Sequence, residues 1–165
     1  MFRGLNPDGF NNYNSNLYSN FTIGGSGTIY AYGSVMSLID QIGELLTIPS
    51  NDNGGCFYYL FCDCDKLVKA PALPATSLAD YCYDSMFYGC TSLTEAPALP
   101  ATSLAAHCYR NMFYYCTSLI EAPALPATSL ASYCYEQMFS DCTSLTEAPA
   151  LPATSLADYC YDSMF

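Results

Sequence analysis

The residues of this chain with the widest chemical repertoire are its ten cysteines. One pair, Cys82 and Cys90, brackets the stretch CYDSMFYGC, and closely similar stretches follow later in the chain. Thiolates bind zinc, act as nucleophiles and form disulfides, whereas a free buried thiol behaves as a small hydrophobic side chain. The spacing of the cysteines and the residues around them favour one of these roles over the others.

The spacing argues against disulfides within a pair. Cys82 and Cys90 are eight residues apart, which corresponds to about 12 Å along a helix, and a disulfide requires Cα atoms within about 7 Å. Bridges between different copies of the stretch stay open as an alternative. We expect buried free thiols that form a structural ladder, namely Cys56, Cys64, Cys82, Cys90, Cys108, Cys116, Cys134, Cys142 and Cys160.

Two specific chemical roles for the cysteines, zinc binding and nucleophilic catalysis, are disfavoured. Cys56, Cys62 and Cys64 are spaced C-x5-C-x-C, unlike the C-x2-4-C pairs of structural zinc sites, so we expect no metal there. His107 is the single histidine and precedes Cys108, which is compatible with an activated nucleophile. However, other copies carry tyrosine in place of His107, so we interpret it as a surface residue. We expect no enzymatic activity and no cofactor.

The composition restricts the partners. The chain has 165 residues with 15 acidic and 4 basic side chains, giving a formal charge of −11. Such a surface repels nucleic acid and anionic membranes. No apolar run approaches the roughly 18 residues of a membrane-spanning helix, and we expect no membrane insertion. The first ten residues, MFRGLNPDGF, do not resemble a signal peptide.

A repeat organises most of the chain. APALPATSLA begins at Ala70, Ala96, Ala122 and Ala148, so the period is 26 residues. We divide the chain into an N-terminal β-rich cap at 1–43, with a hairpin turn near GGSG at 24–27, and a repeat region at 44–165. Its units are 44–69 (imperfect), 70–95, 96–121, 122–147 and 148–165 (truncated). A fixed period of this length indicates a solenoid, whose coils bury a face by stacking.

Comparison of the copies predicts which residues face inward. Cys82, Tyr83, Met86, Phe87 and Cys90 recur without change, whereas the positions of residues 80, 81, 84, 85, 88 and 89 vary. Residues three and four apart share one face of a helix, so LADYCYDSMFYGC is expected to be a short helix with a variable outer face. That outer face includes Arg110, at the position equivalent to residue 84.

The other half of each unit contains two prolines, which exclude a helix. We expect LTEAPAL to form a short extended segment with Leu93, Ala96 and Ala98 facing inward. Pro97 lacks a backbone donor, so any parallel sheet should be short or incomplete.

The order of these residues resembles a known repeat. Leu93, Leu99-Pro100, Leu104-Ala105, Met112-Phe113 and Cys116 follow the pattern of the leucine-rich repeats of BspA-type bacterial surface proteins. The resemblance covers about residues 44–165. It implies an α/β solenoid, a right-handed leucine-rich-repeat coil of short strands and short helices, which here follows the β-rich cap.

Two sets of side chains are candidates for ligand binding. Exposed tyrosines arrayed at a fixed pitch suit the recognition of protein or glycan surfaces, and the candidates are Tyr81, Tyr88, Tyr114, Tyr115 and Tyr133. Glu95, Glu121 and Glu147 are one period apart and should form a column about 5 Å apart. We favour a solvated acidic edge there, with Ca²⁺ binding as the alternative.

The resemblance implies surface adhesion, or recognition of a host or neighbouring-cell protein or glycan, at the cell surface or outside the cell. A phage virion or tail-associated receptor-recognition protein is one alternative, and a purely structural repeat spacer is another. The last unit stops at Phe165 with no polar cap visible, so we expect an apolar flank at Leu145, Met164 and Phe165 that favours self-association.

Overall fold

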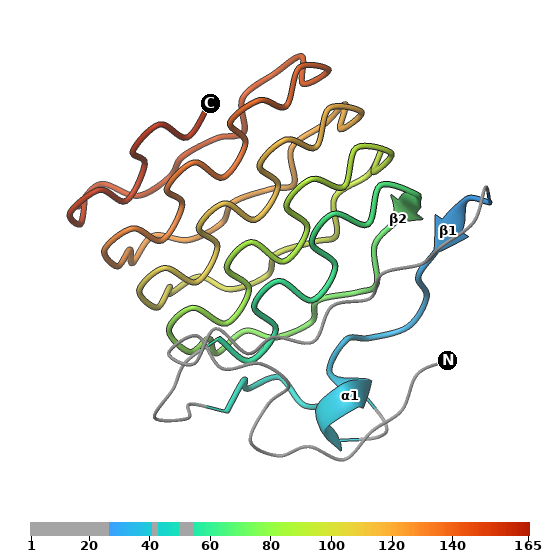
Figure 1. Cartoon of the computed structure of the whole chain (residues 1–165). Coiled ribbons are helices and arrows are strands. Elements are labelled where there is room, and N and C mark those ends of the chain that lie inside the picture. The colour runs from blue at the N-terminus through green and yellow to red at the C-terminus, as the bar shows by residue number, and fades with distance from the viewer. Residues whose placement is uncertain (1–26, 41–42, 50–54) are drawn as a thin grey trace.

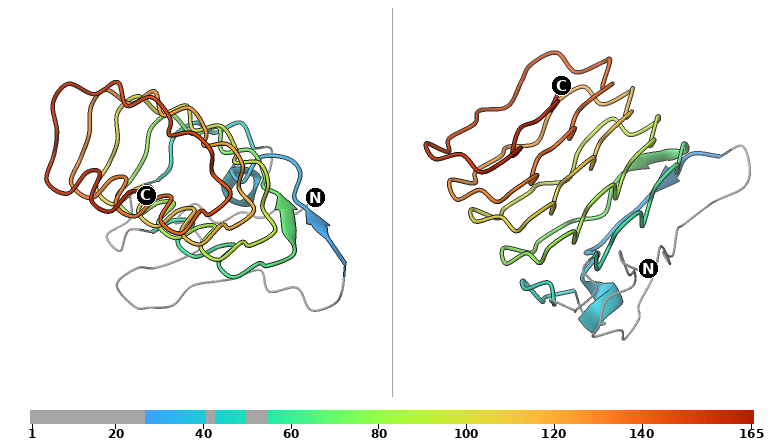
Figure 2. Two further views of the ribbon diagram at one scale, coloured as in Figure 1. Left: turned by 90° about the horizontal axis from the view of Figure 1, so that it is seen from above. Right: turned by 60° about the vertical axis from the view of Figure 1, so that its left-hand side comes forward.

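The structure is a computed structural model of the whole chain, and it describes residues 27–40, 43–49 and 55–165. Its named elements are strand β1 (Ile29–Tyr30), helix α1 (Ser37–Asp40) and strand β2 (Leu67–Lys69). From about residue 55 onward the chain winds in successive coils that lie side by side (Figures 1 and 2). None of the helices in the described part of the chain has the length and apolar character needed to span a membrane.

Residues one repeat period apart are neighbours in space. Lys69 forms a parallel bridge with Glu95, which forms the next one with Glu121, and Ser103 pairs with Ser129 in the same way. Each coil therefore lies in register on the coil that precedes it. The described strands between coils are short, as expected for extended segments with prolines at two positions.

The chain before residue 44 also joins this stack. β1 pairs in parallel with β2, with Ile29 opposite Leu67, and further parallel bridges join Ser34 to Ala72 and Thr47 to Ser77. Residues on both sides of the expected boundary therefore lie against the same coil. Most of the expected hairpin near residues 24–27, and most of the expected cap, lie outside the described residues.

The prediction of a short helix in each repeat unit is wrong. The segment 80–90 is a succession of tight turns in which φ is positive at every fourth residue, with 57° at Tyr81, 53° at Ser85 and 70° at Gly89. Left-handed residues interrupt a right-handed helix, since each costs roughly 1–2 kcal/mol when it carries a side chain. The same spacing of positive φ recurs in the coils that follow.

The backbone hydrogen bonds explain why these turns are favoured. The N–H groups of Cys82 and Met86 donate within their own coil to the carbonyls three residues earlier, at 3.3 and 3.2 Å. By contrast, the N–H groups of Tyr83 and Phe87 donate to the carbonyls of Cys108 and Met112 in the next coil, and both N···O distances are 3.0 Å. Stacking thus pairs backbone groups that an isolated helix would pair locally.

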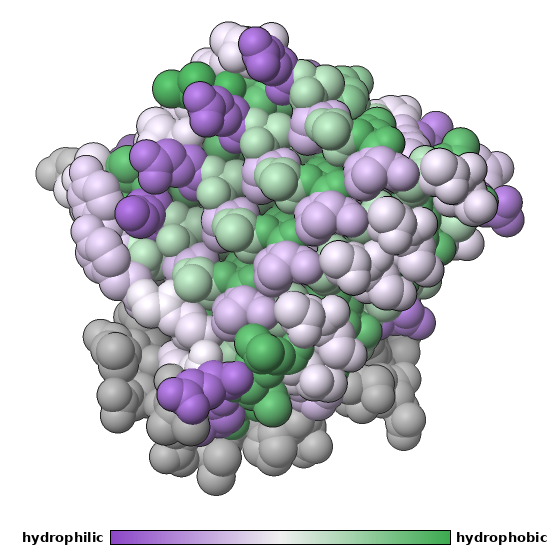
Figure 3. Space-filling view, turned by 180° about the vertical axis from the view of Figure 1, so that it is seen from behind, coloured by the Kyte–Doolittle hydropathy of each residue, from purple (hydrophilic) through white to green (hydrophobic). Residues whose placement is uncertain are grey.

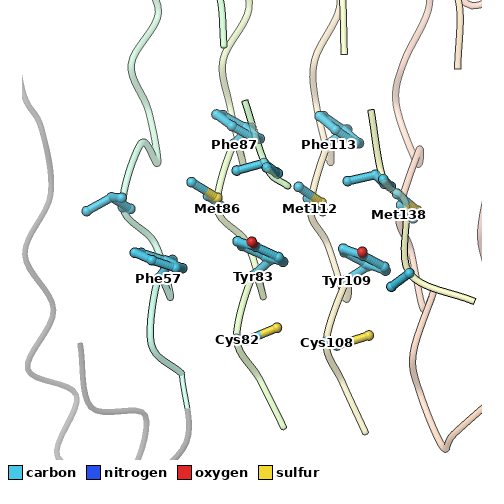
Figure 4. Close-up of a cluster of buried hydrophobic side chains, with 14 of the residues drawn as sticks. Phe57, Cys82, Tyr83, Met86, Phe87, Cys108, Tyr109, Met112, Phe113 and Met138 are labelled. Carbon is cyan, nitrogen blue, oxygen red and sulfur yellow. The ribbon is translucent and has the colours of Figure 1, made fainter. Parts of the chain in front are cut away.

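The expected interior set is confirmed as buried. Cys82, Tyr83, Met86, Phe87 and Cys90 are almost fully inaccessible, and so are their equivalents in the coil that contains Met112. The aromatic rings stack from coil to coil with centroids 5.5 to 5.9 Å apart, in one column through Phe61, Phe87 and Phe113 and another through Tyr83 and Tyr109. Figure 4 shows Phe87 beside Phe113 and Tyr83 beside Tyr109. The four-residue repeat of the turns places residues i and i+4 on one side, as a helix would.

Three expectations about orientation are wrong. Asp84 and Ser85, assigned to the outer face, are buried with their side chains enclosed by neighbouring coils. Ala98, expected to face inward, is exposed, and Leu99 is buried instead. The proline-containing segment departs from regular strand geometry, so simple alternation of side chains does not hold there. Figure 3 shows the side of the molecule opposite to that in Figure 1, and apolar and weakly polar side chains cover much of it.

The last coil has an apolar edge. Phe165 is 57% exposed and Leu156 is 70% exposed, but Met164 is buried and Leu145 is half-buried. Of the three residues expected to be accessible there, Phe165 is the one that is largely exposed.

Candidate functional site

The cysteines line the interior of the stack. All ten are free and buried in the structure, including Cys62, which has no counterpart in the repeat ladder. Cys90 donates its thiol proton to the carbonyl of Phe61 at 3.1 Å, and Cys116 and Cys142 make the equivalent bond one and two coils later. Each thiol of this column therefore has a defined structural partner.

Burial also makes these thiols poor nucleophiles. Desolvation raises the pKa of Cys82 and Cys108 well above the ordinary value, and it raises the pKa of Cys134 and Cys142 to about 11. The thiolate is the reactive form of cysteine, so a raised pKa lowers reactivity at neutral pH. Cys108 follows His107 in the sequence but lies in the interior, whereas the His107 ring stacks on Tyr81.

The expected column of Glu95, Glu121 and Glu147 is seen in part, since the bridges between described residues join the first two glutamates but do not reach Glu147. Glu95 and Glu121 are bridge partners in neighbouring coils, and Lys69 occupies the same column before them. Glu95, Glu121 and Glu147 are all exposed. Among the described residues no group of three or more His, Cys, Asp or Glu side chains has an arrangement suited to a metal ion.

An outward-facing column of stacked rings runs along the turns. Tyr81 stacks on His107 with ring centroids 4.4 Å apart, His107 on Tyr133 at 4.7 Å, and Tyr133 on Tyr159 at 4.8 Å. The rings are within 8° of parallel. His107 thus lies between two tyrosines, and burial together with nearby Arg110 lowers the pKa of its imidazole. Tyr159 belongs to this column although it was absent from the predicted set.

The other three predicted tyrosines lie further along the same turns. Tyr88 stacks on Tyr114 at 5.0 Å, with the rings within 2° of parallel. A hydrogen bond to Asp141 raises the pKa of the Tyr114 phenol. Tyr115, the residue after Tyr114, is half exposed. The structure therefore places four of the five predicted tyrosines in stacks of rings, one through Tyr81 and Tyr133 and the other through Tyr88 and Tyr114.

A buried ion pair joins two coils next to the Tyr81 column. The Asp84 side chain is 0% exposed, and its Oδ2 accepts hydrogen bonds from Arg110 Nη2 at 2.7 Å and Nε at 3.0 Å. Ser85 Oγ donates to Asp84 Oδ1 at 2.8 Å. Burial raises the pKa of Asp84 to about 6, although Arg110 and Ser85 act in the opposite direction.

Sequence reasoning missed this pair because both positions were assigned to a free outer face. The signal was present: Asp84 and Arg110 carry opposite charges and are one period apart, so stacking brings them together. Arg110 also lies 5.7 Å from the centroid of the Tyr81 ring, within the range of a cation–π interaction.

Comparisons with known proteins give no assignment: no family model, no curated protein and no solved structure matches this chain.

Proposed function

We propose that this chain is a leucine-rich-repeat solenoid that acts as a non-enzymatic recognition or adhesion protein at the cell surface or outside the cell. Its ligand is a protein or a glycan of a host or neighbouring cell. The observation that carries this proposal is a column of stacked rings at a varied, partly exposed position of the coils, outside an interior column of cysteine, tyrosine, methionine and phenylalanine that recurs unchanged.

The interior supplies the same contacts in successive coils. Cysteine, tyrosine, methionine and phenylalanine occupy equivalent buried positions around Met86, Met112 and Met138. Meanwhile the partly exposed position of Tyr81 becomes histidine at residue 107, and that of Tyr114 becomes Ser140. A framework of this kind lets the surface change while the packing stays the same.

The exterior columns have the composition of recognition surfaces. Tyrosine buries apolar area while it retains a hydroxyl for hydrogen bonds, and it is enriched where proteins bind partners. The buried thiols with raised pKa values favour a structural role for the cysteines over a catalytic one.

The test is binding of the labelled 165-residue chain to a glycan array and to a panel of bacterial and host cells. We expect saturable binding that Tyr133→Ser together with Tyr159→Ser reduces at least about fivefold, since truncating central aromatic contacts commonly has such an effect. The matched control is Tyr30→Ser with Tyr32→Ser, two exposed tyrosines at the other end of the chain. An absence of any ligand would favour a structural spacer, and equal effects of the two double variants would remove the tyrosine column from the proposal.

A further inference from the structure

The ion pair between coils shows how this surface holds a guanidinium group. Tyr81 and Asp84 are three residues apart in one coil, and Arg110 comes from the next. The Arg110 guanidinium donates two hydrogen bonds to one carboxylate oxygen of Asp84 and lies 5.7 Å from the Tyr81 ring centroid. A tyrosine followed three residues later by an acid therefore forms a guanidinium-binding pair within this fold.

The same pair occurs twice more. Tyr133 is followed by Glu136, and Tyr159 by Asp162, in adjacent coils whose tyrosine rings stack at 4.8 Å. The residue one period after Glu136, where an arginine would complete the pattern, is Asp162. Two acids therefore follow one another in the column where Arg110 follows Asp84.

The charge of Arg110 also acts on Glu136, one period later, but neither Glu136 nor Asp162 is held by an arginine as closely as Asp84 is. Within the described ranges neither Glu136 nor Asp162 takes part in a salt bridge. Glu136 is half-buried, and Tyr159 and Asp162 are exposed, so the position between the two acids is accessible. Burial raises the pKa of Glu136, the charge of Arg110 lowers it and that of Asp162 raises it, and the net rise agrees with a carboxylate that Arg110 compensates only in part.

We propose that Tyr133, Glu136, Tyr159 and Asp162, here called the tyrosine–acid surface, bind an arginine side chain of a partner protein. The guanidinium lies between the two carboxylates and beside the tyrosine rings. Arginine suits this surface better than lysine because its planar group donates several hydrogen bonds at once and packs on aromatic rings. The chain's charge of −11 attracts a basic partner segment.

This inference rests on the proposed recognition function and names the partner chemistry of its surface. The test uses the full chain and a fluorescent hexa-arginine peptide, with hexalysine as the probe of equal charge. The site variant is Glu136→Gln with Asp162→Asn, and the matched control is Glu121→Gln with Glu147→Gln, which removes two charges from exposed positions elsewhere. Circular dichroism checks that every variant is folded.

We expect the site variant to weaken hexa-arginine binding about tenfold, because both ion pairs of the bound guanidinium are lost. The control should weaken it less than about twofold, and wild type should bind hexalysine at least about threefold more weakly than hexa-arginine. Equal losses in the site and control variants, equal binding of the two peptides, or no binding of hexa-arginine would each overturn the inference.

The two proposals fail in different ways. If cells or glycans bind the chain through its tyrosine column but the site variant binds hexa-arginine as wild type does, the arginine inference is wrong and the recognition function stands. If hexa-arginine binding depends on the site and no cell or glycan ligand is found, the arginine site stands and the surface-recognition proposal is wrong.

Discussion

Replacing Arg110 by methionine tests the most consequential interaction that stacking creates between coils. The substitution keeps a long side chain of similar reach but leaves the Asp84 carboxylate buried without its cation. Breaking a buried ion pair by removing one partner costs about 3–5 kcal/mol. At pH 8, above the Asp84 pKa of about 6, we therefore expect Arg110→Met to lower the free energy of unfolding by about 3 kcal/mol. This exceeds the change within about 0.5 kcal/mol that is usual for an exposed residue.

The dependence on pH gives this prediction a second signature. Folding raises the pKa of Asp84, so the folded state binds this proton more tightly than the unfolded state, and the ionised carboxylate opposes folding above about pH 6. Without Arg110, which holds that pKa down, the pKa rises further and protonation relieves the buried charge. We therefore expect the destabilisation by Arg110→Met to shrink as the pH falls from 8 toward 5.

The assay is urea unfolding followed by far-ultraviolet circular dichroism at several pH values, since the chain has no tryptophan. Asp84→Asn supplies the matched control, and the double variant with Arg110→Met should be more stable at pH 8 than Arg110→Met alone. A loss below 0.5 kcal/mol at pH 8, or one that is the same at pH 5 and pH 8, would refute the reasoning and restore the assignment of Arg110 to a free outer face.

Three further perturbations test the interior, the turns and the apolar edge. Met112→Asp places a charge in the buried column and should cost several kcal/mol, seen as loss of the unfolding transition, whereas Tyr115→Asp should remain folded. Gly89→Ala should destabilise by about 1–3 kcal/mol in urea unfolding, because φ there is +70° and the added methyl group meets the Asp63 carboxylate; a wild-type midpoint would contradict this. Phe165→Lys should reduce self-association at high protein concentration, measured as a lower average molecular mass in light scattering. If the wild-type chain is a monomer and the variant has the same mass, the exposed edge does not self-associate.

The buried set was predictable because the chain contains several copies of one unit. Cys82, Met86 and Phe87 recur unchanged while their neighbours vary, and that contrast identifies the interior without any knowledge of backbone geometry. The helix prediction was wrong for a related reason. A run of turns with positive φ at every fourth residue and an α-helix both place residues i and i+4 on the same side, so the pattern of burial does not separate them.

The partners of the backbone and of the charged side chains were harder to predict because they lie in other coils. The N–H of Tyr83 bonds to a carbonyl 25 residues ahead, and local propensity carries no information about such a partner. Likewise, the variation from Asp84 to Arg110 to Glu136 predicts a free surface when each copy is considered alone. In a stacked fold, variation at one position also arises when neighbouring copies compensate one another, as the buried ion pair demonstrates.

The order of charges along one column decides whether neighbouring coils compensate one another there. Where unlike charges follow one another in a column, as Asp84 and Arg110 do, they satisfy one another and strengthen the contact between coils. Where like charges follow one another, as Glu136 and Asp162 do, the two acids do not compensate each other, and the proposed arginine of a partner would relieve the repulsion between them. We therefore expect a single change of charge in one coil to decide whether a position compensates its neighbouring coil or is left for the proposed partner, while the cysteine, methionine and aromatic columns inside keep the same packing.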